Sequence, residues 1–248
     1  MGLLSLDSVI LQSFAYSETS KILRLLTRTH GVRSVIAKGA LRPRSRYGGI
    51  LEPFTDGVAT LHLKEGRDLQ TLGGFELRRS RQGLGRHLLR FGGASLLAEL
   101  LLRTASEEAH PELFDAFRRG LDGLDRAADA ELESVVLAES WHLIGHLGFA
   151  PALDSCLACG RDVEPEEATT FDYAAGGIRC PECAPGAPGR PLPPHARDAL
   201  LRLGRREPVP LDRTEAHWQL LRRFLLHHVI EGRELRSLDF LEAALTAA

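Results

Sequence analysis

All four cysteines of the chain lie in one short stretch and form two Cys-x-x-Cys pairs, Cys156/Cys159 and Cys180/Cys183. A two-residue spacer turns both sulfurs of a pair toward one ion, and a second pair completes the tetrahedron of a four-thiolate Zn²⁺ site. Two disulfides are disfavoured in a reducing cytosol, and a redox centre needs only one such pair. Because sulfur fills all four positions, the spacing predicts one structural, non-catalytic Zn²⁺.

A second chemically informative segment is cationic: it carries Lys38, Arg42, Arg44 and Arg46, with Tyr47 directly after them. Proline and glycine residues within it favour a loop. Long cationic side chains on a loop can follow a phosphate chain and release its counterions, and a tyrosine ring can stack on an unpaired base. The segment therefore predicts nucleic-acid binding. A solvated basic face, a membrane surface or another anion remain alternatives.

The charge distribution restricts this anionic partner to the N-terminal part. Residues 1–80 hold twelve Lys/Arg and seven Asp/Glu, a net charge of +5, whereas the remaining residues carry −7. From Lys21 to Arg46 there are eight basic residues and no acidic one. A basic segment on an otherwise acidic chain indicates a local electrostatic footprint rather than a property of the whole molecule.

The composition excludes several classes of protein. With 248 residues, 44% of them hydrophobic and 26% charged, the chain can form one large domain or two modest ones, so global disorder is excluded. No apolar run approaches the ~18 residues that span a bilayer, and residues 1–16 lack the basic start of a signal peptide. We expect a soluble, cytoplasmic protein without a membrane partner. P-loop, zinc-protease and serine-hydrolase motifs are also missing from the sequence, so no enzyme activity is expected.

The elements that position these residues change in type along the chain. Residues 1–80 contain short alternating runs between turn signals, which predict a small barrel or sandwich of about five strands. Lys21–Arg28 fits a strand or a helix, and the turn at Gly31 favours a hairpin. Helical periodicity dominates from about residue 83. The predicted strands are Ser8–Ala15, Arg33–Ala37, Gly57–Lys64 and Leu69–Leu77, and the predicted helices include Ser95–Arg103, Pro111–Gly120, Glu131–Leu147, His195–Leu203, Arg213–Ile230 and Ser237–Leu245.

We therefore predict an α+β protein: an N-terminal β domain (residues 1–80) and a helical bundle (81–148 and 195–248). The bundle is interrupted by the cysteine module and a Pro/Gly-rich connector (149–194). The N-terminal part resembles the family of the bacterial recombination mediator RecO. Five motifs carry the resemblance in the family's order: Tyr16-Ser-Glu-Thr-Ser-Lys-Ile-Leu, Leu26-Thr-Arg-Thr-His-Gly31, Val35-Ile-Ala-Lys-Gly-Ala40, Pro43-Arg-Ser-Arg46 and Leu51-Glu-Pro-Phe54.

This resemblance implies an OB-fold at the N-terminus and a role in DNA repair without enzyme activity. It implies binding of single- and double-stranded DNA, annealing of complementary strands and help in loading the RecA recombinase, with RecR and the single-stranded DNA-binding protein as partners, in the cytoplasm at the nucleoid. Lys38 and Arg42 are its first DNA-contacting residues, followed by Arg33, Arg44 and Arg46. The alternative is a zinc-containing DNA-binding regulator or replication accessory factor without a recombination role, and a hub that binds an acidic protein tail is a third.

The resemblance also suggests where the acidic tail of the single-stranded DNA-binding protein docks. Five arginines lie near apolar helix faces such as Leu221–Leu225, and a cationic rim around an apolar groove suits an acidic tail with an apolar end. A solvated face over the core is the alternative for each of them. They are Arg202, Arg205, Arg206, Arg222 and Arg223.

Overall fold

The computed structural model describes residues 2–64, 66–104, 107–230 and 234–246, and it divides into two compact units, Met1–Asp125 and Arg126–Ala248. The boundary between them places the first two helices with the N-terminal strands. The three-part division drawn from the sequence stays a prediction. Within the described ranges, no helix is both long and apolar enough to cross a membrane.

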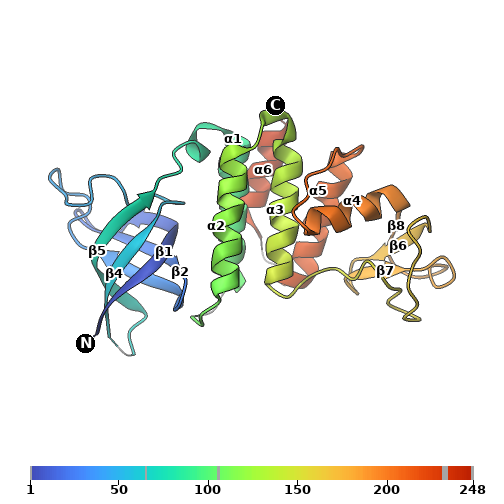
Figure 1. Ribbon diagram of the computed structural model, residues 1–248, viewed down its shortest axis with the longest axis horizontal. Coiled ribbons are helices and arrows are strands. Elements are labelled where there is room, and N and C mark those ends of the chain that lie inside the picture. Colours follow the sequence, from blue (N-terminus) through green and yellow to red (C-terminus); the bar gives the residue numbers. More distant parts are fainter. Residues whose placement is uncertain (1, 65, 105–106, 231–233, 247–248) are drawn as a thin grey trace. The chain divides into compact units, whose positions relative to one another are not determined.

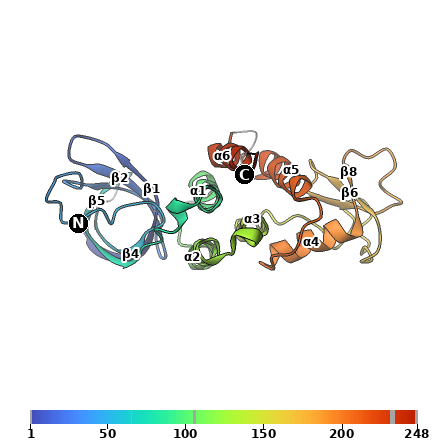
Figure 2. The ribbon, with the colours of Figure 1, turned by 90° about the horizontal axis from the view of Figure 1, so that it is seen from above.

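The first unit begins with five strands that close into a barrel in the order β1-β2-β3-β5-β4 (Figures 1 and 2). All neighbouring strands are antiparallel except β3 and β5. This is the five-stranded Greek-key barrel of an OB-fold, so the predicted fold class is confirmed, including a hairpin at residues 21–28. The strands are β1 (Gly2–Ala15), β2 (Lys21–Thr27), β3 (Gly31–Ala37), β4 (Asp56–Leu63) and β5 (Leu69–Arg79).

Alternation along the strands fills the barrel. Leu23 and Leu25 of β2 face inward with Val35 of β3, because successive side chains of a strand point to opposite faces. The connection between β3 and β4 also contributes to the core, through Tyr47 and Leu51. Burial of each large aliphatic side chain stabilises the fold by roughly 1.5–3 kcal/mol.

Two helices complete the first unit, α1 (Leu88–Thr104) and α2 (Pro111–Arg126), after a short 3-10 turn, η1 (Leu84–Arg86). The buried residues of α2 recur every three or four positions and form one apolar face. Ion pairs join α2 to the barrel. Three arginines and two aspartates form a cluster that we name the arginine clamp, consisting of Arg79, Arg81 and Arg118 with Asp56 and Asp122.

The second unit combines helices with a small three-stranded sheet, ordered β7-β6-β8. Trp141 of α3 packs edge-on against Phe224 of α5, with ring centroids 5.1 Å apart. The predicted helix Arg213–Ile230 is confirmed and continues beyond α5 as a π-helical turn, Leu225–Val229. The elements are η2 (Asp129–Glu131), α3 (Leu132–His146), β6 (Thr169–Asp172), β7 (Gly177–Arg179), β8 (Arg190–Leu192), α4 (Pro194–Gly204), α5 (Thr214–Phe224) and α6 (Arg236–Thr246).

Candidate nucleic-acid interface and metal centre

The two Cys-x-x-Cys pairs form tight turns in the second unit. In the first turn, the Gly160 N–H donates to the Cys156 carbonyl at 2.8 Å, and Gly160 adopts a positive φ of 74° that favours glycine. In the second turn, which follows β7, the N–H groups of Cys183 and Ala184 both donate to the Cys180 carbonyl at 3.0 Å. Each turn therefore brings its two sulfurs to the same side, as the sequence predicts.

The four sulfurs converge from segments more than twenty residues apart. All four Sγ atoms lie within 4.8 Å of one another, and Cys159 Sγ is 3.9 Å from Cys180 Sγ. A tetrahedral Zn²⁺ with Zn–S bonds of about 2.3 Å has sulfur–sulfur edges of about 3.8 Å. The separations and the all-thiolate donor set thus fit one metal ion of the size of zinc, with no position left for a catalytic water.

Hydrogen bonds within the cluster shift the pKa values of its cysteine thiols in opposite directions. Burial opposes ionisation of Cys156, but hydrogen bonds from the backbone of Cys180, Cys159 and Ala158 outweigh it and lower its pKa to about 6. Hydrogen bonds with the sulfurs of Cys180 and Cys159 instead raise the pKa of Cys183 to about 12. Four crowded thiols therefore do not all ionise on their own, and a divalent cation supplies the charge that lets them do so.

The cationic segment of the first unit is an exposed loop between β3 and β4. We name residues 38–46 the basic loop; the side chains of Lys38, Arg42, Arg44 and Arg46 are all exposed. Backbone turns shape it, with the Ser45 N–H donating to the Arg42 carbonyl at 2.9 Å. Within the described residues, no carboxylate pairs with Lys38, Arg42 or Arg44. The structure thus brings these cations together and leaves their charge open to solvent.

Arg33 differs from the loop cations in place and in partner. It lies near the start of β3, opposite Leu25 of β2, whereas Lys38 follows the last residue of β3. Its guanidinium donates to the carboxylate and to the backbone carbonyl of Glu107. Arg28 is engaged in the same way, by two hydrogen bonds of 2.6 and 2.7 Å to Asp115. These paired arginines lie outside the group of unpaired cations.

Tyr47 requires a correction. Its side chain is 3% exposed and belongs to the core of the barrel, so it presents no ring face for a base. The hydroxyl donates to the Leu72 carbonyl at 3.3 Å, and the Arg46 guanidinium covers the ring, 4.9 Å from its centroid. Tyr47 therefore anchors the basic loop to the barrel instead of stacking on nucleic acid.

Exposed aromatic rings lie elsewhere in the first unit. Phe14 at the end of β1 and Tyr16 in the β1–β2 turn are both exposed. The only sequence signal for this exposure is the polar composition of the turn that Tyr16 begins, Ser-Glu-Thr-Ser.

The arginines predicted to receive an acidic tail also need a correction. Leu221 and Leu225 are fully buried, so the apolar face between them is core and not a docking surface. Arg206 donates two hydrogen bonds of 2.7 and 2.8 Å to Glu139, whose side chain is buried. Arg222 pairs with Asp239 and Glu242 at 2.9 Å, and Arg223 covers the ring of Tyr173. Arg202 pairs with exposed Glu207 at 3.3 Å, and Arg205 is exposed.

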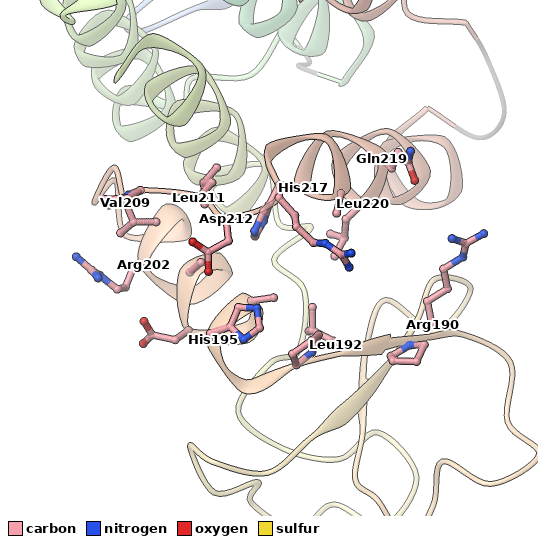
Figure 3. A pocket seen from close by; sticks show the side chains of 18 of the residues that line it. Arg190, Leu192, His195, Arg202, Val209, Leu211, Asp212, His217, Gln219 and Leu220 are labelled. Atoms are coloured by element: carbon pink, nitrogen blue, oxygen red, sulfur yellow. The ribbon is translucent and has the colours of Figure 1, made fainter. Parts of the chain in front are cut away.

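A groove of about 820 Å³ lies beside this region, between α4, β8 and α5 (Figure 3). Leu192, Leu220 and His217 form its buried floor, and Arg190 and Arg202 lie at opposite ends of it in Figure 3. Burial, and then the charge of His195, hold the pKa of His217 below its usual 6.5. Arginines rather than His217 therefore supply positive charge to the groove at neutral pH.

Comparison with known proteins identifies the family. The N-terminal domain of recombination protein O matches residues 1–81, and the C-terminal domain of that protein matches residues 86–239. The chain belongs to the RecO family. It is 35% identical to DNA repair protein RecO of Anaeromyxobacter sp. (strain Fw109-5) over 96% of this chain and 95% of the relative.

Two further relatives of the same name support this membership. The protein of Myxococcus xanthus is 33% identical, over 95% of each chain, and that of Rubrobacter xylanophilus is 35% identical over 78% of this chain and 77% of its own. The two family matches together cover the barrel, the helices and the cysteine module. Membership of the RecO family supports a role in DNA repair and recombination.

Proposed function

We propose that this chain binds single- and double-stranded DNA through the basic loop and acts as a recombination mediator. In this role it anneals complementary strands and, with RecR, assists the loading of RecA in the cytoplasm at the nucleoid. One observation carries the proposal: Lys38, Arg42 and Arg44 are exposed and have no carboxylate partner among the described residues. Unpaired cations on an exposed loop suit a phosphate chain, because each contact releases a condensed counterion.

Annealing needs no covalent step. Two complementary strands repel each other as polyanions, and a cationic surface that holds both lowers the electrostatic barrier to their encounter. Phosphate contacts are indifferent to sequence, which suits a protein that acts on any damaged site. We therefore infer a binding and annealing function and not an enzymatic one.

Charge reversal in the basic loop tests the DNA-binding proposal. The variant Lys38→Glu/Arg42→Glu should lose at least tenfold in affinity for single-stranded and duplex DNA alike, because phosphates are common to both. The control Arg119→Glu/Arg205→Glu changes the net charge equally at two exposed arginines outside the loop. Equal loss in the two variants would contradict a specific role of the loop.

The alternative, a zinc-containing DNA-binding regulator or replication accessory factor, also requires DNA binding. Annealing separates the two functions. A recombination mediator should speed the pairing of complementary strands that are coated with single-stranded DNA-binding protein, and it should speed RecA assembly on them when RecR is added. A regulator that only binds DNA should do neither, whatever its affinity.

We also propose that the four cysteines hold one structural Zn²⁺. The convergence of four sulfurs supports this, because an ion bound between them joins two distant segments of the chain and adds its binding free energy to the folding of the module. Protein purified without chelator should contain one zinc per chain, and Cys159→Ser should lose it. Trp141 and Trp218 both lie in the second unit, so their fluorescence should report the loosening while the barrel stays folded. Well under one zinc per chain would contradict the proposal.

We further propose that the acidic, apolar-ended tail of the single-stranded DNA-binding protein docks in the groove between α4, β8 and α5. Leucines on the floor suit an apolar end, and Arg190 and Arg202 suit acidic side chains. Arg190→Glu/Arg202→Glu should weaken binding of a labelled tail peptide at least fivefold, whereas Arg119→Glu/Arg205→Glu should not. Unchanged binding of the tail peptide by Arg190→Glu/Arg202→Glu would show that the tail does not dock in this groove.

A further inference from the structure

Tyr16 is one of the most exposed large hydrophobic side chains in the described part of the chain. It is 60% exposed, and Phe14, two residues earlier on β1, is 43% exposed. The turn that carries Tyr16 is ordered by its own backbone, since the Tyr16 N–H donates to the Ser20 carbonyl at 2.9 Å. An exposed ring on a fixed backbone costs little conformational entropy when it binds a flat partner.

The turn with Tyr16 is tied to the basic loop. The Leu41 N–H donates to the Thr19 carbonyl at 3.0 Å, so the middle of the loop lies against the β1–β2 turn. Lys21, the first residue of β2, stands opposite Ala37, the last residue of β3, which places Lys38 at the same end of the barrel. Exposed aromatic rings and unpaired cations therefore meet at one end of the barrel.

The outer face of the strands extends this platform. Phe14 stands opposite Ile22 of β2, and Ile22 stands opposite Ile36 of β3. Leu23 follows Ile22 on β2 and Val35 precedes Ile36 on β3, and both point into the core. Phe14 and the two isoleucines therefore form a row on the outside of the barrel, where the isoleucines are half-buried. Oligonucleotides bind OB-folds across the outer face of strands 2 and 3 and along the loop that joins strands 1 and 2.

We propose that Tyr16 is the residue that distinguishes single-stranded from duplex DNA, by stacking on an unpaired base whose phosphates contact Lys38 and Arg42. The inference rests on the proposed DNA binding and adds a second contact to it. Cations alone attract single strands and duplexes alike, but only an unpaired base exposes a face to an aromatic ring. Phe14, beside Tyr16 on the same platform, is placed to receive the next base.

A nucleic acid fits this surface better than an acidic peptide does. The loop that carries the cations adjoins the turn that carries Tyr16, as the charged backbone of a single strand adjoins its stacked bases. An apolar anchoring side chain of a peptide would find buried leucines in the groove of the second unit instead. If the surface bound a peptide and not DNA, substitution of Tyr16 would leave the affinities for oligo-dT and duplex DNA unchanged.

The test compares Tyr16 variants of the full chain for binding to oligo-dT and to a duplex of equal length. Tyr16→Ala should lower the affinity for oligo-dT by roughly five- to tenfold, the low end of what one stacked base contributes, and change duplex affinity less than twofold. Tyr16→Phe keeps the ring and should retain the affinity. Leu3→Ala, at the opposite end of β1 and 62% exposed, is the matched control and should change neither.

A spectroscopic arm keeps the test independent of small affinity changes. Trp141 and Trp218 are buried in the second unit, so Tyr16→Trp introduces an exposed indole whose emission oligo-dT should quench far more than the duplex does. Unchanged oligo-dT affinity in Tyr16→Ala, with affinity lost in Lys38→Glu/Arg42→Glu, would overturn the stacking role and leave the proposed DNA binding intact. Equal losses of both DNA forms in Tyr16→Ala would assign Tyr16 to loop structure only. Failure of both variants to change binding would overturn both proposals.

Discussion

The arginine clamp and the basic loop belong to the same compact unit and use the same kind of side chain in opposite ways. In the clamp, Arg81 is fully buried and donates to Asp122 at 2.7 Å and to the Phe54 carbonyl at 2.9 Å. In the basic loop, Lys38, Arg42 and Arg44 are exposed and have no carboxylate partner among the described residues. The number of positive charges in a segment therefore does not show where an anion binds. A cation is available to an anion only where the fold places no carboxylate beside it.

The energetic consequences of the two settings also differ. Arg81 of the clamp is desolvated, and its loss leaves Asp56, only 3% exposed, without part of its compensation. Lys38, Arg42 and Arg44 of the loop are hydrated and contribute little to stability, because none of them forms an ion pair with the described part of the chain. Substitutions in the clamp should thus change stability, and substitutions in the loop should change DNA binding.

The largest effect is expected at Arg81. Arg81→Leu should lower the free energy of unfolding of the first unit by about 3 kcal/mol, since Asp56 keeps only Arg118 and Asp122 keeps only Arg79 as a partner within the clamp. Hydrogen exchange of barrel peptides at increasing urea concentrations measures this. Arg78→Leu removes an exposed arginine that pairs with Asp7 at 2.7 Å, and it should cost less than about 1 kcal/mol. Similar losses in the two variants would break the distinction between buried and exposed pairs.

A smaller effect of the same kind is expected in the second unit, at two adjacent arginines. Arg206→Ala should lower the free energy of unfolding of this unit by about 2–3 kcal/mol, because buried Glu139 loses two charged hydrogen bonds. Arg205→Ala removes an exposed neighbour and should change it by less than about 0.5 kcal/mol. Tryptophan fluorescence during urea unfolding reports this unit directly. If Arg205→Ala destabilised the unit as much as Arg206→Ala, the stabilising role of the Arg206–Glu139 pair would be contradicted.

The smallest stability effect is expected at Tyr47. Tyr47→Phe removes the hydroxyl that donates to the Leu72 carbonyl and should cost about 1 kcal/mol. Its affinity for oligo-dT should remain that of the unmodified protein, because the ring lies in the core. A loss of oligo-dT affinity in this variant, without a stability change, would assign the Tyr47 hydroxyl to DNA binding and not to the core. Urea unfolding and oligo-dT titration of the same preparation check both statements.

Much of the fold follows from local patterns in the sequence. Alternation and turn residues located the five strands, with β1 extending six residues further toward the N-terminus than Ser8. The helices could be predicted because apolar residues that recur every three or four positions lie on one buried face of a helix. The cysteine cluster was also predictable, since the two-residue spacing within each pair restricts how the chain can place its sulfurs.

The electrostatic partners could not be predicted, because they come from distant parts of the chain. Asp115 neutralises Arg28 across 87 residues, and Glu107 neutralises Arg33 across 74. No spacing rule links such positions. Tyr47 was misassigned for a related reason: it lies in an irregular connection without periodicity, and only the closed barrel shows that this connection fills the core.

The central claim is that unpaired cations, and not net charge, bind DNA, and the salt dependence of oligo-dT affinity tests it most directly. With about four phosphate contacts, log K should fall with log[salt] with a slope of about −3. Lys38→Gln/Arg42→Gln/Arg44→Gln should weaken that slope by about 2. The matched variant Arg28→Gln/Arg33→Gln/Arg78→Gln removes the same charge from arginines that are paired with Asp115, Glu107 and Asp7, and it should keep the slope near −3. Equal weakening in both variants would contradict the claim and leave only a general effect of net charge.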